Sequence, residues 1–224
     1  MIEDKELVVA IDGPAGAGKS TVAKHVADKL SYIYIDTGAM YRALTLKALN
    51  ENIDLAAEEE VAAMAKETEV KFEKVNEQER VILDGVDVTS EIRNNKVSNN
   101  VSLVAKIKEV RERLVKLQRK MAARGGVVMD GRDIGTVVLP KADVKVFLTA
   151  TVEERTLRRY DDLKEKGETV DFEKLKQEII RRDKIDKNRD VSPLKKAEDA
   201  HEIDTTNLSI SAVVNKIINL CQEV

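Results

Sequence analysis

Short apolar runs alternate with longer amphipathic segments along most of the chain. Apolar runs that predict β-strands lie at Leu7–Asp12, Tyr32–Asp36, Val127–Asp130, Val144–Thr149 and His201–Asp204. Helical periodicity predicts helices at Lys19–Leu30, Ala39–Asn50, Val104–Arg124, Val152–Lys166, Phe172–Lys187 and Ile210–Cys221. Most of the runs are apolar on both faces and are separated by helices, which favours a parallel sheet with helices on its faces. The pattern therefore predicts a three-layer α/β fold around a central parallel sheet of five strands.

Residues 63–100 interrupt this alternation. Val70–Val75 alternates apolar and polar positions, Arg80–Leu83 is a second short run, and Val86–Thr89 follows the turn signal Asp84-Gly85. These three segments predict a small antiparallel three-stranded sheet inserted into the parallel core. An insertion without a functional role remains an alternative at this point.

Composition limits the classes of protein to consider. The 224 residues are 42% hydrophobic and 35% charged, as expected of one large globular domain or a core with a small insertion. The net charge of −3 gives no reason to expect a nucleic-acid partner. No apolar run approaches the ~18 residues needed to cross a membrane, and the charged N-terminus does not resemble a signal peptide. With Cys221 as the one cysteine, we expect a cytoplasmic protein. We also expect a monomer.

A glycine-rich segment joins the first predicted strand to the first predicted helix. Residues 13–20 read Gly-Pro-Ala-Gly-Ala-Gly-Lys-Ser and match the phosphate-loop pattern G-x-x-x-x-G-K-[ST]. The backbone N–H groups of such a loop face nucleotide phosphates, and the helix N-terminus adds positive potential. Lys19 would contact the β- and γ-phosphates, and the Ser20 hydroxyl would be a ligand of Mg²⁺. The segment predicts binding of ATP or GTP.

Charged residues follow the second and third predicted strands. Asp36 and Thr37 end the second strand, and Arg42 falls one turn into the next helix, where it could grip a second phosphate. Asp130 ends the third strand and is typical of the acidic residue that supports Mg²⁺ in phosphate-loop enzymes. Arg132 and Asp133 follow directly. Taken alone, an Asp-Thr pair before a helix is also a common N-cap.

A third charged group lies in the predicted helix Phe172–Lys187 and just beyond it. Arg182, Asp186 and Arg189 recur at i, i+4 and i+7 and therefore share one helix face. They could form an intrahelical row of ion pairs, or they could face a phosphate and a ribose. A guanine-reading N-K-x-D sequence is absent from the chain, which disfavours a switch GTPase.

Together these segments resemble the bacterial cytidylate kinases, a family of nucleoside-monophosphate kinases with the P-loop NTPase fold. The resemblance rests on residues 11–21, on Asp-Thr-Gly-Ala-Met-Tyr-Arg at 36–42, on Asp-Gly-Arg-Asp-Ile-Gly-Thr at 130–136 and on residues 182–189. It implies a core formed by residues 1–62, 101–151 and 168–224, with an NMP-binding insertion at 63–100. It also implies a short helical lid at 152–167.

The resemblance also implies roles for individual residues. ATP would be bound by Gly13, Pro14, Ala15, Gly16, Ala17, Gly18, Lys19, Ser20, Thr21 and Arg158, with Mg²⁺ held through ATP and Ser20. CMP would be bound by Thr37, Tyr41, Arg42, Ser102, Arg111, Asp130, Arg132, Asp133, Arg182, Asp186 and Arg189. The catalytic residues would be Lys19, Arg132, Arg155 and Arg159. Some members of the family carry glycine at the position of Ser20.

The expected activity is transfer of a phosphoryl group from ATP to CMP, and also to dCMP, with Mg²⁺ as cofactor. Two alternatives remain. One is a phosphate-loop kinase for another nucleoside monophosphate or a small metabolite. The other is a protein that binds ATP as a switch and transfers no phosphoryl group.

Overall fold

The computed structural model of the chain describes residues 6–75, 78–165 and 167–224. The fold divides into two compact units. The first unit contains the chain up to Asp36 and again from Arg119 onward, and the second unit is Thr37–Gln118. The second unit contains the whole 63–100 segment. The finer division into core, insertion and lid stays a prediction.

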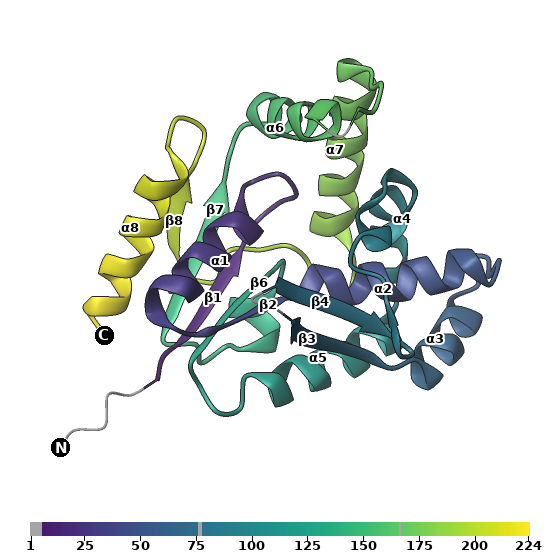
Figure 1. Cartoon of the computed structure of the whole chain (residues 1–224), viewed down its shortest axis with the longest axis horizontal. Helices are drawn as coiled ribbons and strands as arrows, with labels where there is room; N and C mark the ends of the chain where they lie inside the picture. Colours follow the sequence, from purple (N-terminus) through teal and green to yellow (C-terminus); the bar gives the residue numbers. More distant parts are fainter. Residues whose placement is uncertain (1–5, 76–77, 166) are drawn as a thin grey trace. The chain divides into compact units, whose positions relative to one another are not determined.

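A five-stranded parallel sheet forms the centre of the first unit (Figure 1). Its strands are β1 (Val8–Asp12), β2 (Ile33–Asp36), β6 (Val127–Gly131), β7 (Val144–Thr149) and β8 (His201–Asp204). The spatial order is β2-β6-β1-β7-β8, with every neighbouring pair parallel. All five predicted strands are confirmed. Because parallel strands place their carboxyl ends at one edge, the predicted site residues that follow β1 and β6 gather there.

Two helices pack together on the central sheet. Helix α1 (Lys19–Leu30) and helix α8 (Ile210–Gln222) lie side by side in Figure 1 and are in contact. Their buried faces join β1, β6 and β7 in one apolar core that includes Val26 and Ile217. Valine and isoleucine dominate this core because β-branched side chains suit buried parallel strands. The core fixes both ends of the segment that carries the phosphate loop.

Helices α6 (Val152–Glu165) and α7 (Phe172–Asn188) form a second packed pair in this unit (Figure 1). Leu163, Leu175 and Ile179 make a small core of their own between them. The rings of Tyr160 and Phe172 pack edge to face, with their centroids 5.7 Å apart. The predicted lid helix is therefore half of a helical hairpin.

The second unit combines helices with a small sheet. Its helices are α2 (Thr37–Asn50), α3 (Glu58–Glu67), the 3₁₀ turn η1 (Glu91–Arg93), α4 (Asn95–Ala105) and α5 (Lys108–Met121), of which the last turn enters the first unit. Strands β3 (Val70–Val75), β4 (Gln78–Leu83) and β5 (Val86–Asp87) pair antiparallel in the order β3-β4-β5. The predicted three-stranded antiparallel sheet is confirmed. Its base is tied to α2 by an ion pair between Lys47 and Asp84.

The prediction of one helix over Val104–Arg124 was wrong. The chain ends α4 at Ala105 and begins α5 at Lys108, with fully buried Ile107 between the two helices. Neither glycine nor proline marks this break, so burial of Ile107 and packing of α4 on α2 decide it. Helix α2 begins at Thr37, two residues earlier than predicted. Helices α3 and α4 and a π-helical turn, η2 (Ile134–Val138), were not predicted.

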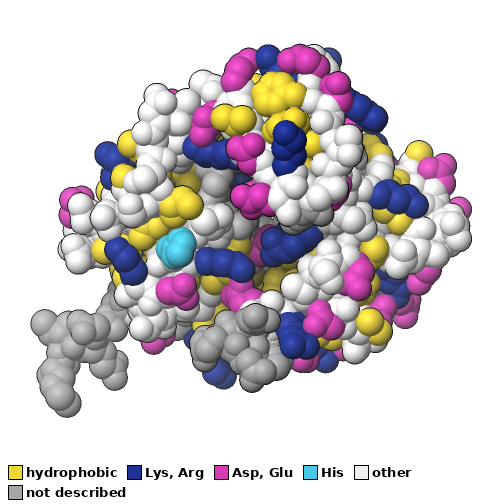
Figure 2. Space-filling model, turned by 45° about the horizontal axis from the view of Figure 1, so that its top comes forward, with side chains coloured by type: hydrophobic (Ala, Val, Ile, Leu, Met, Phe, Trp, Pro, Cys, Tyr) yellow, Lys and Arg dark blue, Asp and Glu magenta, His cyan; other side chains and the backbone are white. Residues whose placement is uncertain are grey.

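Within the described ranges, no helix has the length and apolar character needed to cross a lipid bilayer. Lys and Arg side chains are interspersed with Asp and Glu on the face drawn in Figure 2. This mixture agrees with the small net charge of −3.

Candidate active site

The phosphate loop leaves β1 under tight steric constraint. Gly13 has φ = 150°, and a Cβ at this position would lie 2.0 Å from the carbonyl oxygen of Leu148 in β7. Gly16, at φ = 76°, faces the Cβ and backbone of Arg155. Gly18 is the N-cap residue of α1 and has a left-handed backbone conformation. Neighbouring protein atoms therefore require glycine at positions 13 and 16, and the left-handed backbone at φ = 82° favours it at position 18.

Lys19, the first residue of α1, is buried within the loop. Its Nζ donates a hydrogen bond to the Pro14 carbonyl at 2.8 Å. Burial, together with the positive charges of Arg132 and Arg182, lowers the pKa of Lys19 to about 7, against the opposing effect of Asp130. These effects require that the phosphate-loop lysine and the two arginines lie close together in the first unit. Three cationic groups in one place suit a ligand that carries several phosphates.

Asp130 lies beside the start of the phosphate-loop helix. Its carboxylate accepts hydrogen bonds from the Ser20 hydroxyl at 3.1 Å and from the Tyr34 hydroxyl at 2.6 Å. Burial and the neighbouring charge of Asp36 raise the pKa of Asp130 to about 6.

The oxygen atoms around Asp130 also bear on the predicted cofactor. Carboxylate and hydroxyl oxygens are ligands that Mg²⁺ prefers, so the pair of Ser20 and Asp130 fits this ion. Among the residues that the structure describes, no group of three or more His, Cys, Asp or Glu side chains could hold a metal ion by itself. The phosphates of a bound nucleotide would therefore have to supply part of the coordination shell.

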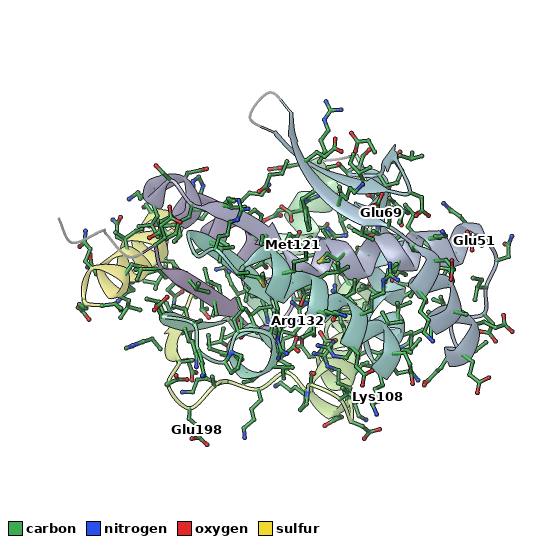
Figure 3. The ribbon with its side chains drawn as sticks, turned by 90° about the horizontal axis from the view of Figure 1, so that it is seen from below. Glu51, Glu69, Lys108, Met121, Arg132 and Glu198 are labelled. Atoms are coloured by element: carbon green, nitrogen blue, oxygen red, sulfur yellow. The ribbon has the colours of Figure 1, made fainter. Side chains whose placement is uncertain are left out.

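Helix α7 reaches the residues that follow β6. Arg132 (Figure 3) donates from its Nε to Asp186 Oδ2 at 3.0 Å, and Arg189 forms an ion pair with Asp133 at 3.6 Å. Asp133, Asp186 and Arg189 are buried. Arg182, on the same helix, acts electrostatically on Lys19. The charged face of α7 therefore contacts the segment after β6 and acts electrostatically on the phosphate loop. Ion pairs confined to the helix itself would make neither interaction.

The predicted lid arginines lie on α6 and differ in their contacts. Arg155 is buried, donating to the carbonyl oxygens of Ala150 and Ala15 at 3.0 and 3.1 Å and pairing with Asp183 at 2.7 Å. Arg158 donates to the hydroxyl and carbonyl of Thr205 and to Glu154. Arg159 is partly buried on the same helix. Arg155 thus joins the phosphate loop to α7.

The remaining predicted CMP residues belong to the second unit. Thr37, Tyr41 and Arg42 lie in the first two turns of α2, Ser102 is buried in α4, and Arg111 is buried in α5. The Arg111 guanidinium lies 5.4 Å from the centre of the Tyr41 ring and donates to the Ala105 carbonyl at 3.0 Å. The structure therefore brings Tyr41 and Arg111 together from different helices.

Sequence reasoning assigned no role to four residues that organise this site. Asp12 accepts a hydrogen bond from the segment after β6, and Tyr34 donates one to Asp130. Asp183 forms an ion pair with Arg155, and Thr205 accepts a hydrogen bond from Arg158. A tyrosine inside an apolar strand carries no functional signal. Two of the four residues adjoin predicted site residues in the sequence, and this position could have indicated them. Asp12 directly precedes the glycine-rich loop, and Asp183 directly follows Arg182.

Comparisons with known proteins match nearly the whole chain. The family model described as cytidylate kinase matches residues 9–223. The chain is 58% identical to the cytidylate kinase of Bacillus velezensis and 56% identical to that of Bacillus subtilis strain 168, in each case over 98% of both chains.

A solved gluconokinase from Sinorhizobium meliloti 1021 shares the fold with a TM-score of 0.51 and 12% sequence identity, covering 97% of this chain and 93% of that one. At that identity the likeness concerns the P-loop kinase fold alone. The match of the family model over nearly all of the sequence, with relatives at 56–58% identity, shows that the chain belongs to the cytidylate kinase family.

Proposed function

We propose that the protein transfers the γ-phosphoryl group of ATP to CMP and to dCMP, giving ADP and the corresponding diphosphate. Family membership supports the reaction. The structural observation that carries the proposal is the convergence of Lys19, Arg132 and Arg182 in one unit. A phosphate loop alone needs one lysine, whereas two further guanidinium groups near it suit a second substrate, with Arg132 on its phosphate and Arg182 on its ribose.

The ATP side of the site would consist of the phosphate loop and α6. Residues 13–21 would bind the phosphates through backbone N–H groups and through Lys19. Ser20 and Asp130 would hold the Mg²⁺ that accompanies ATP, and this ion supplies charge neutralisation at the phosphates when it is bound. Arg155, Arg158 and Arg159 would add positive charge from α6.

The CMP side would use the residues that the family resemblance implies. Arg132 and Arg189 would grip the CMP phosphate together with Thr37 and Arg42, while Arg182 and Asp186 would hold the ribose. Ser102, Arg111 and Asp133 would read the edge of the cytosine, and Tyr41 would line the pocket.

The reaction places modest demands on proton transfer. A phosphate oxygen of CMP is already a nucleophile, so a strong general base is unnecessary and catalysis depends on alignment and charge. Arg132, held at its Nε by Asp186, keeps other donors of its guanidinium group for the phosphate. Burial of Asp133 and Ser102 favours base selection, because a wrong base would leave buried polar groups unpaired.

An acceptor panel tests the proposal. The protein is incubated with ATP, Mg²⁺ and one of CMP, dCMP, UMP, AMP or GMP, and formation of ADP and of the diphosphate is followed. We expect transfer to CMP and dCMP at rates at least tenfold above those for AMP and GMP, because selection rests on buried hydrogen bonds.

The same panel separates the alternatives. Transfer to another acceptor in preference to CMP would show a different phosphate-loop kinase. Binding of ATP without transfer to any acceptor would instead support a switch protein. Nothing in the chemistry of the site favours either alternative. Since ATP and nucleoside monophosphates are cytoplasmic metabolites, the proposal also places the protein in the cytoplasm.

A further inference from the structure

Asp12 is a buried carboxylate at the end of β1 with no role in the proposed contacts to ATP or CMP. It directly precedes Gly13, and its own backbone lies between β6 and β7, in register with Gly131 and Phe147. The side chain is 4% exposed. A carboxylate at such a position is costly to bury unless it is fully hydrogen-bonded.

Both oxygens of Asp12 accept backbone hydrogen bonds from one short segment. Oδ1 accepts from the N–H of Ile134 at 2.8 Å, and Oδ2 accepts from the N–H of Gly135 at 2.7 Å. These two N–H groups open the π-helical turn η2. The first N–H groups of a helical turn lack partners within the turn and need a cap. Asp12 supplies that cap from 122 residues away along the chain.

The residue that precedes the turn, Asp133, would ordinarily provide such a cap. Here Asp133 is the N-cap residue of η2 but makes no side-chain cap hydrogen bond. Its carboxylate lies instead against Arg189, at 3.6 Å. Both residues belong to the proposed CMP site. The cap from Asp12 thus allows the Asp133 side chain to point toward α7.

We propose that Asp12 is a positioning residue that fixes Arg132 and Asp133 for CMP by capping the turn that follows them. The residue thereby joins the ATP loop, which begins at Gly13, to the segment that would read CMP. This inference rests on the proposed function. We assign Asp12 no catalytic role, because its two oxygens accept hydrogen bonds from the backbone N–H groups of Ile134 and Gly135.

The electrostatics of Asp12 define the assay conditions. Burial raises the pKa of Asp12 to about 7, although the hydrogen bonds from Gly135 and Ile134 act in the opposite direction. That value also includes the charge of Asp133, which acts to raise the pKa, and the charge of Lys19, which acts to lower it. At pH 8 the carboxylate is ionised, so both oxygens accept hydrogen bonds.

The test compares Asp12→Asn with wild type at pH 8. Asparagine keeps the shape but offers one acceptor oxygen in place of two, so one N–H of the turn loses its partner. We expect the KM for CMP and the Kd for CMP to rise about tenfold, as for loss of a charge-assisted hydrogen bond. The KM for ATP should stay within about twofold, because the β-ladder on both sides of Asp12 holds the start of the loop.

Asp143→Asn is the matched control. Asp143 accepts a hydrogen bond from the N–H of Val8 at 2.9 Å, at the opposite end of the same strand. The same loss of one acceptor there should leave both KM values unchanged. In addition, the double variant Asp12→Asn/Asp133→Asn should raise the KM for CMP by less than the sum of the two single effects in free energy. The reason is that Asp12 would act on CMP through the Asp133 carboxylate.

The outcomes distinguish this inference from the proposed function. A wild-type protein that does not phosphorylate CMP contradicts the proposed function. If wild type is active but Asp12→Asn leaves the KM for CMP unchanged, or raises both KM values equally, the positioning role is overturned.

Should Asp12→Asn fail to fold, Gly135→Ala tests the same contact. A Cβ there would lie 3.4 Å from Asp12 Oδ2 and 3.2 Å from Lys145. We expect a higher KM for CMP alone, and equal effects on ATP and CMP, or none, would overturn the inference.

Discussion

Lys19 combines burial with the proximity of two guanidinium groups. Both effects disfavour its charged form and lower its pKa to about 7. A bound nucleotide would reverse this situation, because phosphate charges stabilise the ammonium group. The residue therefore costs stability in the folded protein, and that cost is offset by its role in binding. Functional sites commonly lower the stability of the folded protein in this way.

Replacing Lys19 separates its functional role from its structural cost. We expect Lys19→Met to lower kcat/KM by about 10²–10³-fold or more, as for loss of one transition-state contact. The melting temperature should stay the same or rise, because the variant no longer buries a charge. Initial rates with CMP and a thermal melt at pH 7 measure the two effects.

Lys47→Met serves as the control for that change. Lys47 is also partly buried and pairs with Asp84 at 2.5 Å, but it lies outside the proposed site. This variant should keep kcat/KM within about twofold and lose stability, because it gives up an ion pair that ties two elements together. Near-normal transfer by Lys19→Met would contradict the phosphate-loop assignment.

Cys221 gives a prediction about reactivity. The residue lies in the buried face of α8, and burial raises the pKa of its thiol to about 11. At pH 8 the thiolate fraction is therefore negligible, and the thiol should not react with a disulfide reagent in the folded protein.

Titration with such a reagent checks this expectation. We expect almost no reaction at pH 8, and one thiol per chain after addition of denaturant. Because the folded pKa lies above the ordinary value of 9.0, stability contributed by this group is lost as the pH rises from 9 to 11. Rapid reaction in native buffer would contradict the buried placement.

Among the elements, α7 and the residue after it make ion pairs that reach α6 and the segment after β6. Asp183 pairs with Arg155 of α6, and Asp186 pairs with Arg132 beyond β6. Arg189, directly after the helix, pairs with Asp133. Buried ion pairs of this kind lose much of their value when one partner is removed, because the other charge stays buried.

Substitutions on α7 should therefore affect one substrate more than the other. We expect Arg182→Ala and Asp186→Ala to raise the KM for CMP at least tenfold and that for ATP less than threefold, since their proposed ligand is the ribose of CMP. Steady-state kinetics with each substrate varied in turn measure this difference.

Arg181→Ala is the control on the same helix, because Arg181 is exposed and adjacent to Arg182. Its kinetic constants should equal those of wild type. If Arg182→Ala and Asp186→Ala changed both KM values equally, or neither, the charged face of α7 would be a structural row of ion pairs.

At the scale of the whole molecule, the proposed CMP residues divide between the two compact units. Arg132 and Asp186 belong to the first unit, and Arg42 and Arg111 belong to the second. The chain passes between the units after Asp36 and after Gln118. The first crossing falls directly between two residues of the predicted motif, Asp36 and Thr37.

We predict that the protein is a monomer. All proposed contacts to ATP and CMP come from one chain, so a second copy is not needed to complete the site. Light scattering coupled to size-exclusion chromatography should give a mass near 25.0 kDa across a tenfold range of concentration. A mass of twice that value at all concentrations would contradict the prediction.

Local signals in the sequence were enough to predict the parallel sheet, the phosphate loop and the small antiparallel sheet. Apolar runs, glycine spacing and turn residues are local signals, and each acts over a few residues. Val144–Thr149 was predicted with its observed bounds, because a strand buried on both faces has a distinctive composition. The cytidylate kinase resemblance likewise rested on short motifs.

Which charged groups meet depends on how distant segments of the chain pack together. No local pattern around Asp12 indicates that it caps a turn 122 residues later. No local pattern around Tyr34 indicates its hydrogen bond to Asp130. The break at Ile107 likewise depends on burial by distant segments. Such contacts depend on strand order and helix packing, which bring remote residues together and leave no periodic signal in the chain.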